Sequence, residues 1–232
     1  GEPVGRCVLK AVSDARAAID SNTYLGTILL LVPLAKVPSG EPLARGVEQV
    51  LGGLTPDDAR DVYAAIALAC PGGLGQADAM DVHAEPPDDL LGAMVLAAPR
   101  DLVARQYANG FHEVLKIARP WLIEGLAAGW DLQLSILHTY VRLLAREPDS
   151  LIARKCGRET AAKASQQAQR VLDSGRAGSE DYQRALSDLD FWLRSDGHRR
   201  NPGTTADLVA AALFAALRDG QIPWPLDFAR PT

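Results

Sequence analysis

Aromatic residues are scarce in this 232-residue chain, at 6%. Long stretches rich in β-branched or aromatic residues, which strands favour, are also missing. Alanine and leucine, both strong helix formers, dominate the apolar residues. Apolar residues make up 47% of the chain, enough for a sizeable core. The composition therefore predicts an all-α fold.

Cysteines and long apolar runs are few as well. Cys7, Cys70 and Cys156 have no metal-ligand spacing, and an odd number of cysteines does not suggest a disulfide framework. The longest apolar run, residues 24–35, has about 12 residues and is too short to cross a bilayer. No secretory signal is visible at the start. We predict reduced thiols in a cytoplasmic protein without a membrane partner.

The charge balance is mildly acidic. The formal net charge is −5, and the one basic cluster is the short run His198, Arg199 and Arg200. Proteins that bind nucleic acids usually carry a basic patch or stripe. We therefore predict no nucleic-acid partner, and we regard a homo-oligomer as possible.

Apolar spacing and capping signals predict a single-domain bundle of about ten helices over residues 1–220. A proline-rich tail follows over residues 221–232. Residues 24–34 are apolar on all sides and predict a buried helix, and residues 99–118 are predicted to form helix throughout. The chain starts without methionine and with residues that already predict helix, so we expect a natural N-terminal segment to be missing.

Two polar breaks occur in the first half of the chain. Asn22 and Thr23 precede the apolar helix 24–34, where they could bind a phosphate or simply cap the helix. Capping is the favoured interpretation from this segment alone. The glycine-rich stretch 71–87 contains several acidic residues, among them Asp81. Its carboxylates could hold Mg²⁺, or the stretch could be a plain surface loop.

A third break lies at Asp149, which follows Pro148 and precedes Arg154 and Lys155 by about one turn. A carboxylate and two cations at this spacing could bind a metal ion and a phosphate together. Alternatively, Asp149 caps a helix and the two cations only flank it.

The most informative break is Asn201-Pro-Gly-Thr-Thr-Ala-Asp207. Pro202 and Gly203 predict a tight turn, Thr204 and Thr205 place hydroxyls at the next helix start, and Asp207 is expected in the first turn. The helix that follows is very apolar, which would bury Asp207 unless it faced a cleft. A buried carboxylate needs a partner, often a cation.

These motifs, taken in order, resemble the triphosphoribosyl-dephospho-CoA synthase family from about Gly5 to Gly220. Residues 201–207 resemble the family's Ser-Pro-Gly-Gly-Ser-Ala-Asp-Leu pattern, which is the most specific. Residues 149–154 resemble its Asp-Thr-x-x-x-Arg pattern, and residues 22–26 its Asn-Thr-His-Lys-Gly pattern.

The resemblance implies an all-α enzyme that transfers a triphosphoribosyl group from ATP to dephospho-CoA and releases adenine, with Mg²⁺ on the triphosphate. It implies that Asp149 and Asp207 bind metal or stabilise the reacting C1′ atom. Asp81, a carboxylate near the glycines of the stretch 71–87, is predicted from the residues themselves as a further metal ligand. The predicted nucleotide-binding residues are Asn22, Thr23, Arg154, Lys155, Gly203, Thr204 and Thr205.

Two departures from the family pattern keep alternatives open. Tyr24 and Leu25 stand where the family has His-Lys, and the early Pro-Lys-Pro-Gly segment is not found. One alternative is a phosphoribosyl-type transferase with another acceptor, in one-carbon cofactor biosynthesis. Another is a non-catalytic helical protein that binds a nucleotide or a partner.

Overall fold

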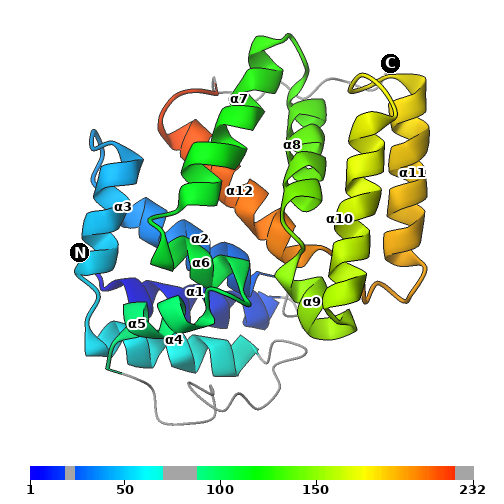
Figure 1. Ribbon diagram of the computed structural model, residues 1–232. Helices are drawn as coiled ribbons and strands as arrows, with labels where there is room; N and C mark the ends of the chain where they lie inside the picture. The colour runs from blue at the N-terminus through cyan, green and yellow to red at the C-terminus, as the bar shows by residue number, and fades with distance from the viewer. Residues whose placement is uncertain (19–23, 70–87, 223–232) are drawn as a thin grey trace. The chain divides into compact units, whose positions relative to one another are not determined.

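A computed structural model describes residues 1–18, 24–69 and 88–222 (Figure 1). The regular elements in these ranges are twelve α-helices and one π-helix, which confirms the all-α prediction. Contacts group the chain into two compact units, residues 1–112 and 113–232. The single domain predicted over residues 1–220 stays a prediction. Asn22, Thr23 and Asp81 lie outside the described residues, as does most of the predicted tail.

The first unit is built from six helices. They are α1 (Val4–Ala18), α2 (Leu25–Lys36), α3 (Leu43–Gly52), α4 (Pro56–Ala69), α5 (Leu90–Ala97) and α6 (Leu102–Ala108). Helix α1 packs against α4 and α2, and α2 also contacts α3 and α6. The apolar run predicted to be a buried helix is α2, which continues through Pro33 to Lys36.

A buried carboxylate joins α1 to α4 in this unit. Asp58 accepts hydrogen bonds from the Gly5 amide at 2.7 Å, the Thr55 amide at 2.9 Å and the Thr55 hydroxyl at 2.8 Å. The Asp58 amide in turn donates to the Thr55 hydroxyl at 3.3 Å. The reciprocal pair between Thr55 and Asp58 is a capping box, and it sets the start of α4 at Pro56.

Asp58 is expected to make the stability of the protein sensitive to acid. Burial raises the pKa of the Asp58 carboxyl, but the bonds from Gly5 and Thr55 outweigh burial, and the pKa lies below its ordinary value. A lowered pKa stabilises the fold above the unfolded-state value of about 4, and this contribution is lost as the pH falls through the folded-state pKa. Lowering the pH from about 5 to about 2.5 should therefore reduce the free energy of unfolding more for the wild type than for Asp58→Asn, as measured by urea unfolding.

The exposed Asp57 provides the control for charge, because Asp57→Asn removes the same charge from the same turn of α4. Asp57 pairs with Arg60, but both side chains are exposed and such pairs contribute little, so Asp57→Asn should keep most of the wild-type acid response. Equal acid responses for the wild type and Asp58→Asn would show that Asp58 titrates alike in the folded and unfolded states.

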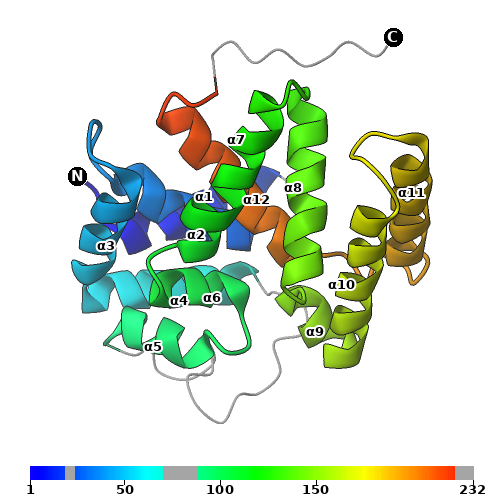
Figure 2. The same ribbon diagram turned by 45° about the horizontal axis from the view of Figure 1, so that its top comes forward.

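The second unit begins with the π-helix η1 (Glu113–Ala118) and α7 (Arg119–Ala127). It continues with α8 (Leu132–Arg146), α9 (Ser150–Cys156), α10 (Arg158–Asp173), α11 (Glu180–Arg194) and α12 (Gly203–Arg218). Helix α8 packs against α7 on one side and α10 on the other, as Figures 1 and 2 show. Helix α12 contacts η1, α7, α8 and the short α9.

The prediction of one continuous helix over residues 99–118 is wrong. Helix α6 ends at Ala108, and Gly110 and Phe111 adopt positive φ angles of 66° and 63° before η1 begins. The Phe111 side chain is fully buried, and its ring lies 5.9 Å from the ring of Tyr107. Core packing thus stabilises a backbone conformation that is uncommon for a non-glycine residue.

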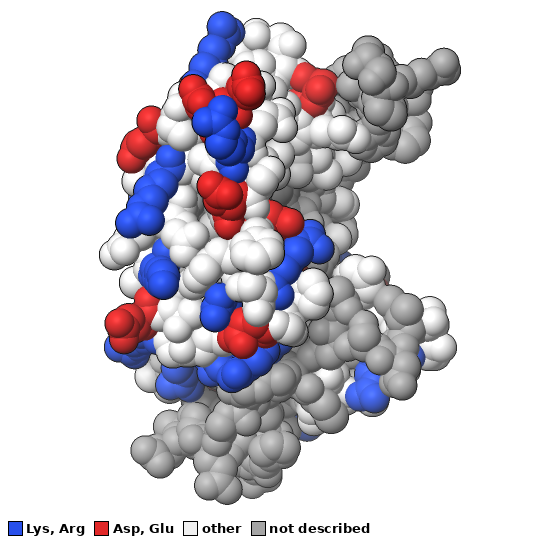
Figure 3. Space-filling view, turned by 90° about the vertical axis from the view of Figure 1, so that its right-hand side faces the viewer, with Lys and Arg blue, Asp and Glu red and all other residues white. Residues whose placement is uncertain are grey.

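The exposed sides of α10 and α11 carry both signs of charge, interspersed over the face shown in Figure 3. On α11, Arg194 pairs with Asp190, and Arg184 pairs with Asp181 and Glu180. Pairs three or four residues apart support a surface helix by a few tenths of a kcal/mol each. None of the helices in the described ranges combines the length and apolar character that crossing a membrane requires.

Candidate functional site

Asp149 caps α9. Its Oδ1 atom accepts hydrogen bonds from the amides of Leu151 at 2.9 Å and Ile152 at 3.0 Å. These are the orphan donors of the first turn, and an aspartate is one of the preferred residues for satisfying them. The capping interpretation of Asp149 is therefore confirmed.

The same carboxylate also binds the start of α12. Its Oδ2 atom accepts hydrogen bonds from the Thr205 amide at 2.7 Å and the Thr205 hydroxyl at 2.8 Å. Asp149 is 0% exposed and Thr205 is 1% exposed. A carboxylate offers about four acceptor positions, so the chain's own donors occupy both of its oxygens.

Another hydrogen bond between α9 and α12 lies beside the two that Asp149 accepts from Thr205. The Ser150 hydroxyl donates to the Thr204 hydroxyl at 3.1 Å, and both side chains are buried. We call the four residues Asp149, Ser150, Thr204 and Thr205 the α9–α12 junction. It brings together two motifs that lie about fifty residues apart in the sequence, and the part played by Ser150 was not predicted.

Burial shifts the pKa values of two groups at the junction, Asp149 and the neighbouring Tyr140. Burial raises the pKa of the Asp149 carboxyl above its ordinary value, although the hydrogen bonds from Ile152, Thr205 and Leu151 act in the opposite direction. Tyr140 on α8 is a further group near it, since burial first and the charge of Asp149 second raise the pKa of the Tyr140 phenol. The sequence offered no signal that Tyr140 belongs to this neighbourhood.

Asp207 lies two residues beyond the junction on α12. The helix begins at Gly203, earlier than the sequence predicted, so Asp207 lies in the second turn of α12 and not in the first. It is half-buried. On α9, Arg154 is half-buried and Lys155 is exposed. Gly203 lies against α9, because a Cβ atom there would come within 2.6 Å of a methyl carbon of Leu151.

The three predicted magnesium ligands, Asp149, Asp207 and Asp81, differ in how the structure places them. Mg²⁺ takes oxygen ligands and is often held by one or two carboxylates completed by phosphate and water. No group of three or more histidine, cysteine, aspartate or glutamate side chains could hold a metal ion within the described ranges. Asp149 has both oxygens engaged, and Asp81 lies outside these ranges. Asp207 is the remaining predicted ligand, and its role stays a prediction.

Two other polar residues belong to the core and not to the site. Tyr107 is 2% exposed and donates to the Leu29 carbonyl at 2.7 Å. The Nδ1 atom of His138 lies 3.0 Å from the Tyr182 hydroxyl oxygen. Burial lowers the pKa of His138, and the charge of Arg142 adds to this.

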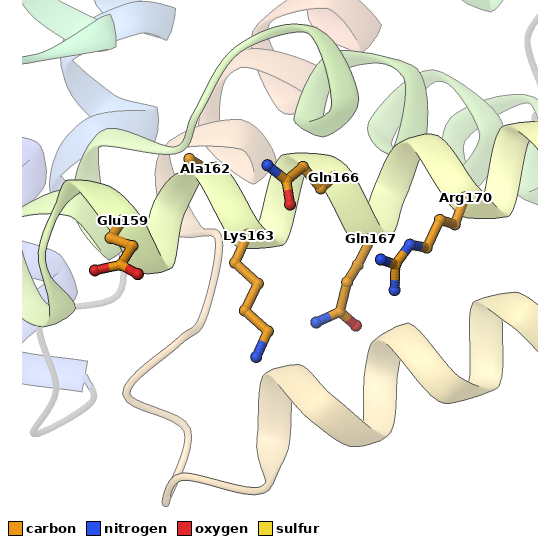
Figure 4. A pocket seen from close by; sticks show the side chains of 6 residues that line it. All are labelled: Glu159, Ala162, Lys163, Gln166, Gln167 and Arg170. Atoms are coloured by element: carbon orange, nitrogen blue, oxygen red, sulfur yellow. The ribbon is translucent and has the colours of Figure 1, made fainter.

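A depression of about 260 Å³ lies along α10. Its lining residues are Glu159, Ala162, Lys163, Gln166, Gln167 and Arg170 (Figure 4). All six side chains come from one helix, and none of the predicted site residues is among them. A groove of this kind encloses little of a ligand, whereas binding pockets bury most of one.

Comparison with known proteins gives a consistent result. The family model described as CitG, ATP:dephospho-CoA triphosphoribosyl transferase, matches residues 1–225. The crystal structure of a protein from Archaeoglobus fulgidus, assigned as a triphosphoribosyl-dephospho-CoA synthase, is similar with a TM-score of 0.72 and 28% identity. That match covers 93% of this chain and 89% of the other.

Two curated relatives match over part of their length. One, from Pseudomonas syringae, is assigned as a 2-(5''-triphosphoribosyl)-3'-dephosphocoenzyme-A synthase and is 36% identical over 112 residues. One from Pectobacterium atrosepticum with the same assigned activity is 36% identical over 103 residues. These matches cover 48% and 44% of this chain, and only 38% and 32% of the two relatives.

Proposed function

The chain belongs to the ATP:dephospho-CoA triphosphoribosyl transferase family, and we propose that it transfers a triphosphoribosyl group from ATP to dephospho-CoA or a related cofactor precursor. In this reaction a ribose hydroxyl of the acceptor attacks C1′ of ATP. The bond from C1′ to adenine breaks, a new C1′–O bond forms, and the hydroxyl proton leaves with adenine. The triphosphate stays on the transferred ribose.

The observation that carries the proposal is the α9–α12 junction. It holds the segment 201–207, the most specific family motif, against the segment 149–155, which carries two cations. Triphosphate requires cations, and a C1′ atom with oxocarbenium character gains from a nearby negative charge. We assign Arg154 and Lys155 to the phosphates, Gly203 to the nucleotide and Asp207 to C1′ or to the Mg²⁺ that accompanies ATP.

Three proposed contacts rest on the sequence alone. Asn22 and Thr23 are assigned to the nucleotide because they match the family's Asn-Thr positions, and Asp81 is assigned to the metal ion because it is a carboxylate near a glycine-rich stretch. The acceptor is the least constrained part of the proposal, since the chain spans about a third of the length of its curated relatives.

A non-catalytic nucleotide-binding protein is the second candidate. The observation in its favour is the replacement of the family's His-Lys pair by Tyr24, which is 45% exposed, and Leu25. A phenol and an isobutyl group cannot supply the cationic phosphate contact of a lysine. This change would remove two polar groups from the nucleotide site.

Adenine release separates the two candidates. The purified protein is incubated with ATP, Mg²⁺ and dephospho-CoA, and free adenine is measured by chromatography while the product is identified by mass. We expect adenine and triphosphoribosyl-dephospho-CoA in equal amounts, and none without the acceptor. ATP binding in calorimetry without adenine release, with dephospho-CoA and with pterin or furan acceptors, would contradict transfer and favour the binding protein.

A further inference from the structure

Asp149 does more in this structure than cap a helix, and less than a free catalytic carboxylate could. We propose that Asp149 is a positioning residue, which holds the first turn of α12 so that residues 203–207 keep the geometry that binds the nucleotide. The inference rests on the proposed function. It replaces the direct metal or C1′ role that the sequence suggested for Asp149.

Other cap aspartates of the chain show what capping alone requires. Asp89 begins α5 by accepting from the Gly92 amide, and Asp131 begins α8 by accepting from the Leu134 amide at 2.7 Å. Both are exposed residues. Burial of a carboxylate is costly even when it is hydrogen-bonded. An exposed aspartate is therefore sufficient to cap a helix, so capping alone does not explain why Asp149 is buried.

The reason lies in the bonds to α12. Asp149 accepts from both donors of Thr205, and the Ser150–Thr204 bond lies one residue later on α9 and one residue earlier on α12. Three hydrogen bonds at two adjacent positions restrain both the separation and the rotation of the paired helix starts. The first turn of α12 is thereby fixed against α9, which it contacts, as the views in Figures 1 and 2 agree.

Fixing this turn also fixes the groups proposed to bind ATP. Asp207 follows the clamped Thr205 by two residues on α12, and Arg154 follows Asp149 by five residues at α9. A carboxylate and a cation assigned to one triphosphoribosyl group thus depend on the three hydrogen bonds that join α9 to α12. An error of about 1 Å in such positions can cost on the order of a hundredfold in rate.

The variant Asp149→Asn separates the two functions of the carboxylate. Asparagine is as good a cap as aspartate, so its side-chain oxygen can still accept from Leu151 and Ile152. Its NH₂ group would then face the two donors of Thr205, and the bonds to α12 are lost. Asp131→Asn makes the same chemical change at a cap without a link to a second helix. Thr205→Val removes only the hydroxyl donor, and Thr205→Ser retains it.

Three readouts are compared for each variant: kcat and KM for ATP in the adenine assay, Kd for ATP by calorimetry, and hydrogen exchange of the Thr205 amide. In Asp149→Asn we expect KM and Kd for ATP to rise by about tenfold or more, with faster exchange at Thr205. Thr205→Val should show a smaller change in the same direction. Thr205→Ser, which retains the donor, should be closer to the wild type than Thr205→Val, and Asp131→Asn should resemble the wild type.

Unchanged exchange and unchanged Kd in Asp149→Asn would overturn the proposal. A fall in kcat with both of these unchanged would also overturn it, because Asp149 would then act on the reacting atoms directly. If Asp149→Asn does not fold, Thr205→Val carries the same test. Hydrogen exchange and Kd for ATP can be measured without turnover. If the wild type binds ATP but releases no adenine, the proposed function is wrong, and these two measurements still test the role of Asp149.

Discussion

Alanine in place of Asp207 is expected to abolish adenine release and leave the fold intact. Asp207 is half-buried on the second turn of α12, a helix whose core contacts come from apolar residues such as Leu208 and Ala212. Its removal therefore leaves no large cavity. Charged groups aimed at a developing charge commonly contribute a factor of about 100 to 1,000 in kcat, and we expect a loss of at least that size.

Asp207→Asn and Asp188→Ala complete the design. The asparagine variant keeps the shape and removes the charge, so it should lose nearly as much activity as alanine if the charge is what matters. Asp188 lies exposed on α11 in the same unit, and its alanine variant should remain fully active. Circular dichroism and thermal unfolding check the fold of each variant. Full activity in Asp207→Ala would remove this residue from the site.

The largest effect on stability is expected from Gly5→Ala. A Cβ atom at position 5 would lie 2.5 Å from the Asp58 carbonyl oxygen and 2.6 Å from the Asp58 Cα atom. These are backbone atoms, so α1 and α4 would have to move apart. The movement would also break the bond from the Gly5 amide to the buried Asp58 carboxylate. Alanine favours helix by about 1 kcal/mol over glycine. Helix propensity alone therefore predicts a more stable variant, whereas the steric clash predicts a less stable one.

We expect Gly5→Ala to lower the free energy of unfolding by about 3 kcal/mol, since overpacking costs about 1–3 kcal/mol and the lost buried hydrogen bond adds to this. Gly52→Ala is the control. Gly52 ends α3, and a Cβ atom there would meet nothing within 4 Å, so alanine should be neutral or slightly stabilising. Urea unfolding measures both. A neutral result at position 5 would mean that α1 and α4 can separate at little cost.

Much of the fold could be predicted from local signals. Apolar spacing and turn residues predict helices over 43–51, 131–146 and 159–173, which correspond to α3, α8 and α10 within one residue at each end. Side-chain caps add a local signal at the starts of α8 and α4, where Asp131 and the Thr55–Asp58 pair bond to amides of their own helices. Such contacts join residues close in sequence, and they therefore leave a local signature.

The errors have physical causes of another kind. The break between α6 and η1 depends on the burial of Phe111, which holds a positive φ angle that its residue type does not favour. The early start of α12 at Gly203 depends on Asp149, a residue from another helix, which accepts from the Thr205 amide. Neither cause can be read from residues close in the sequence.

The sequence by itself therefore determined the helical class, most helix limits, the family and the motifs in which a site should be sought. Only the tertiary structure decided which partners these motif residues have. Asp149 accepts hydrogen bonds from amides of two helices and from the Thr205 hydroxyl, and Ser150 pairs with Thr204. The reason is that a buried carboxylate takes its role from the donors that surround it, and these donors come from distant parts of the chain.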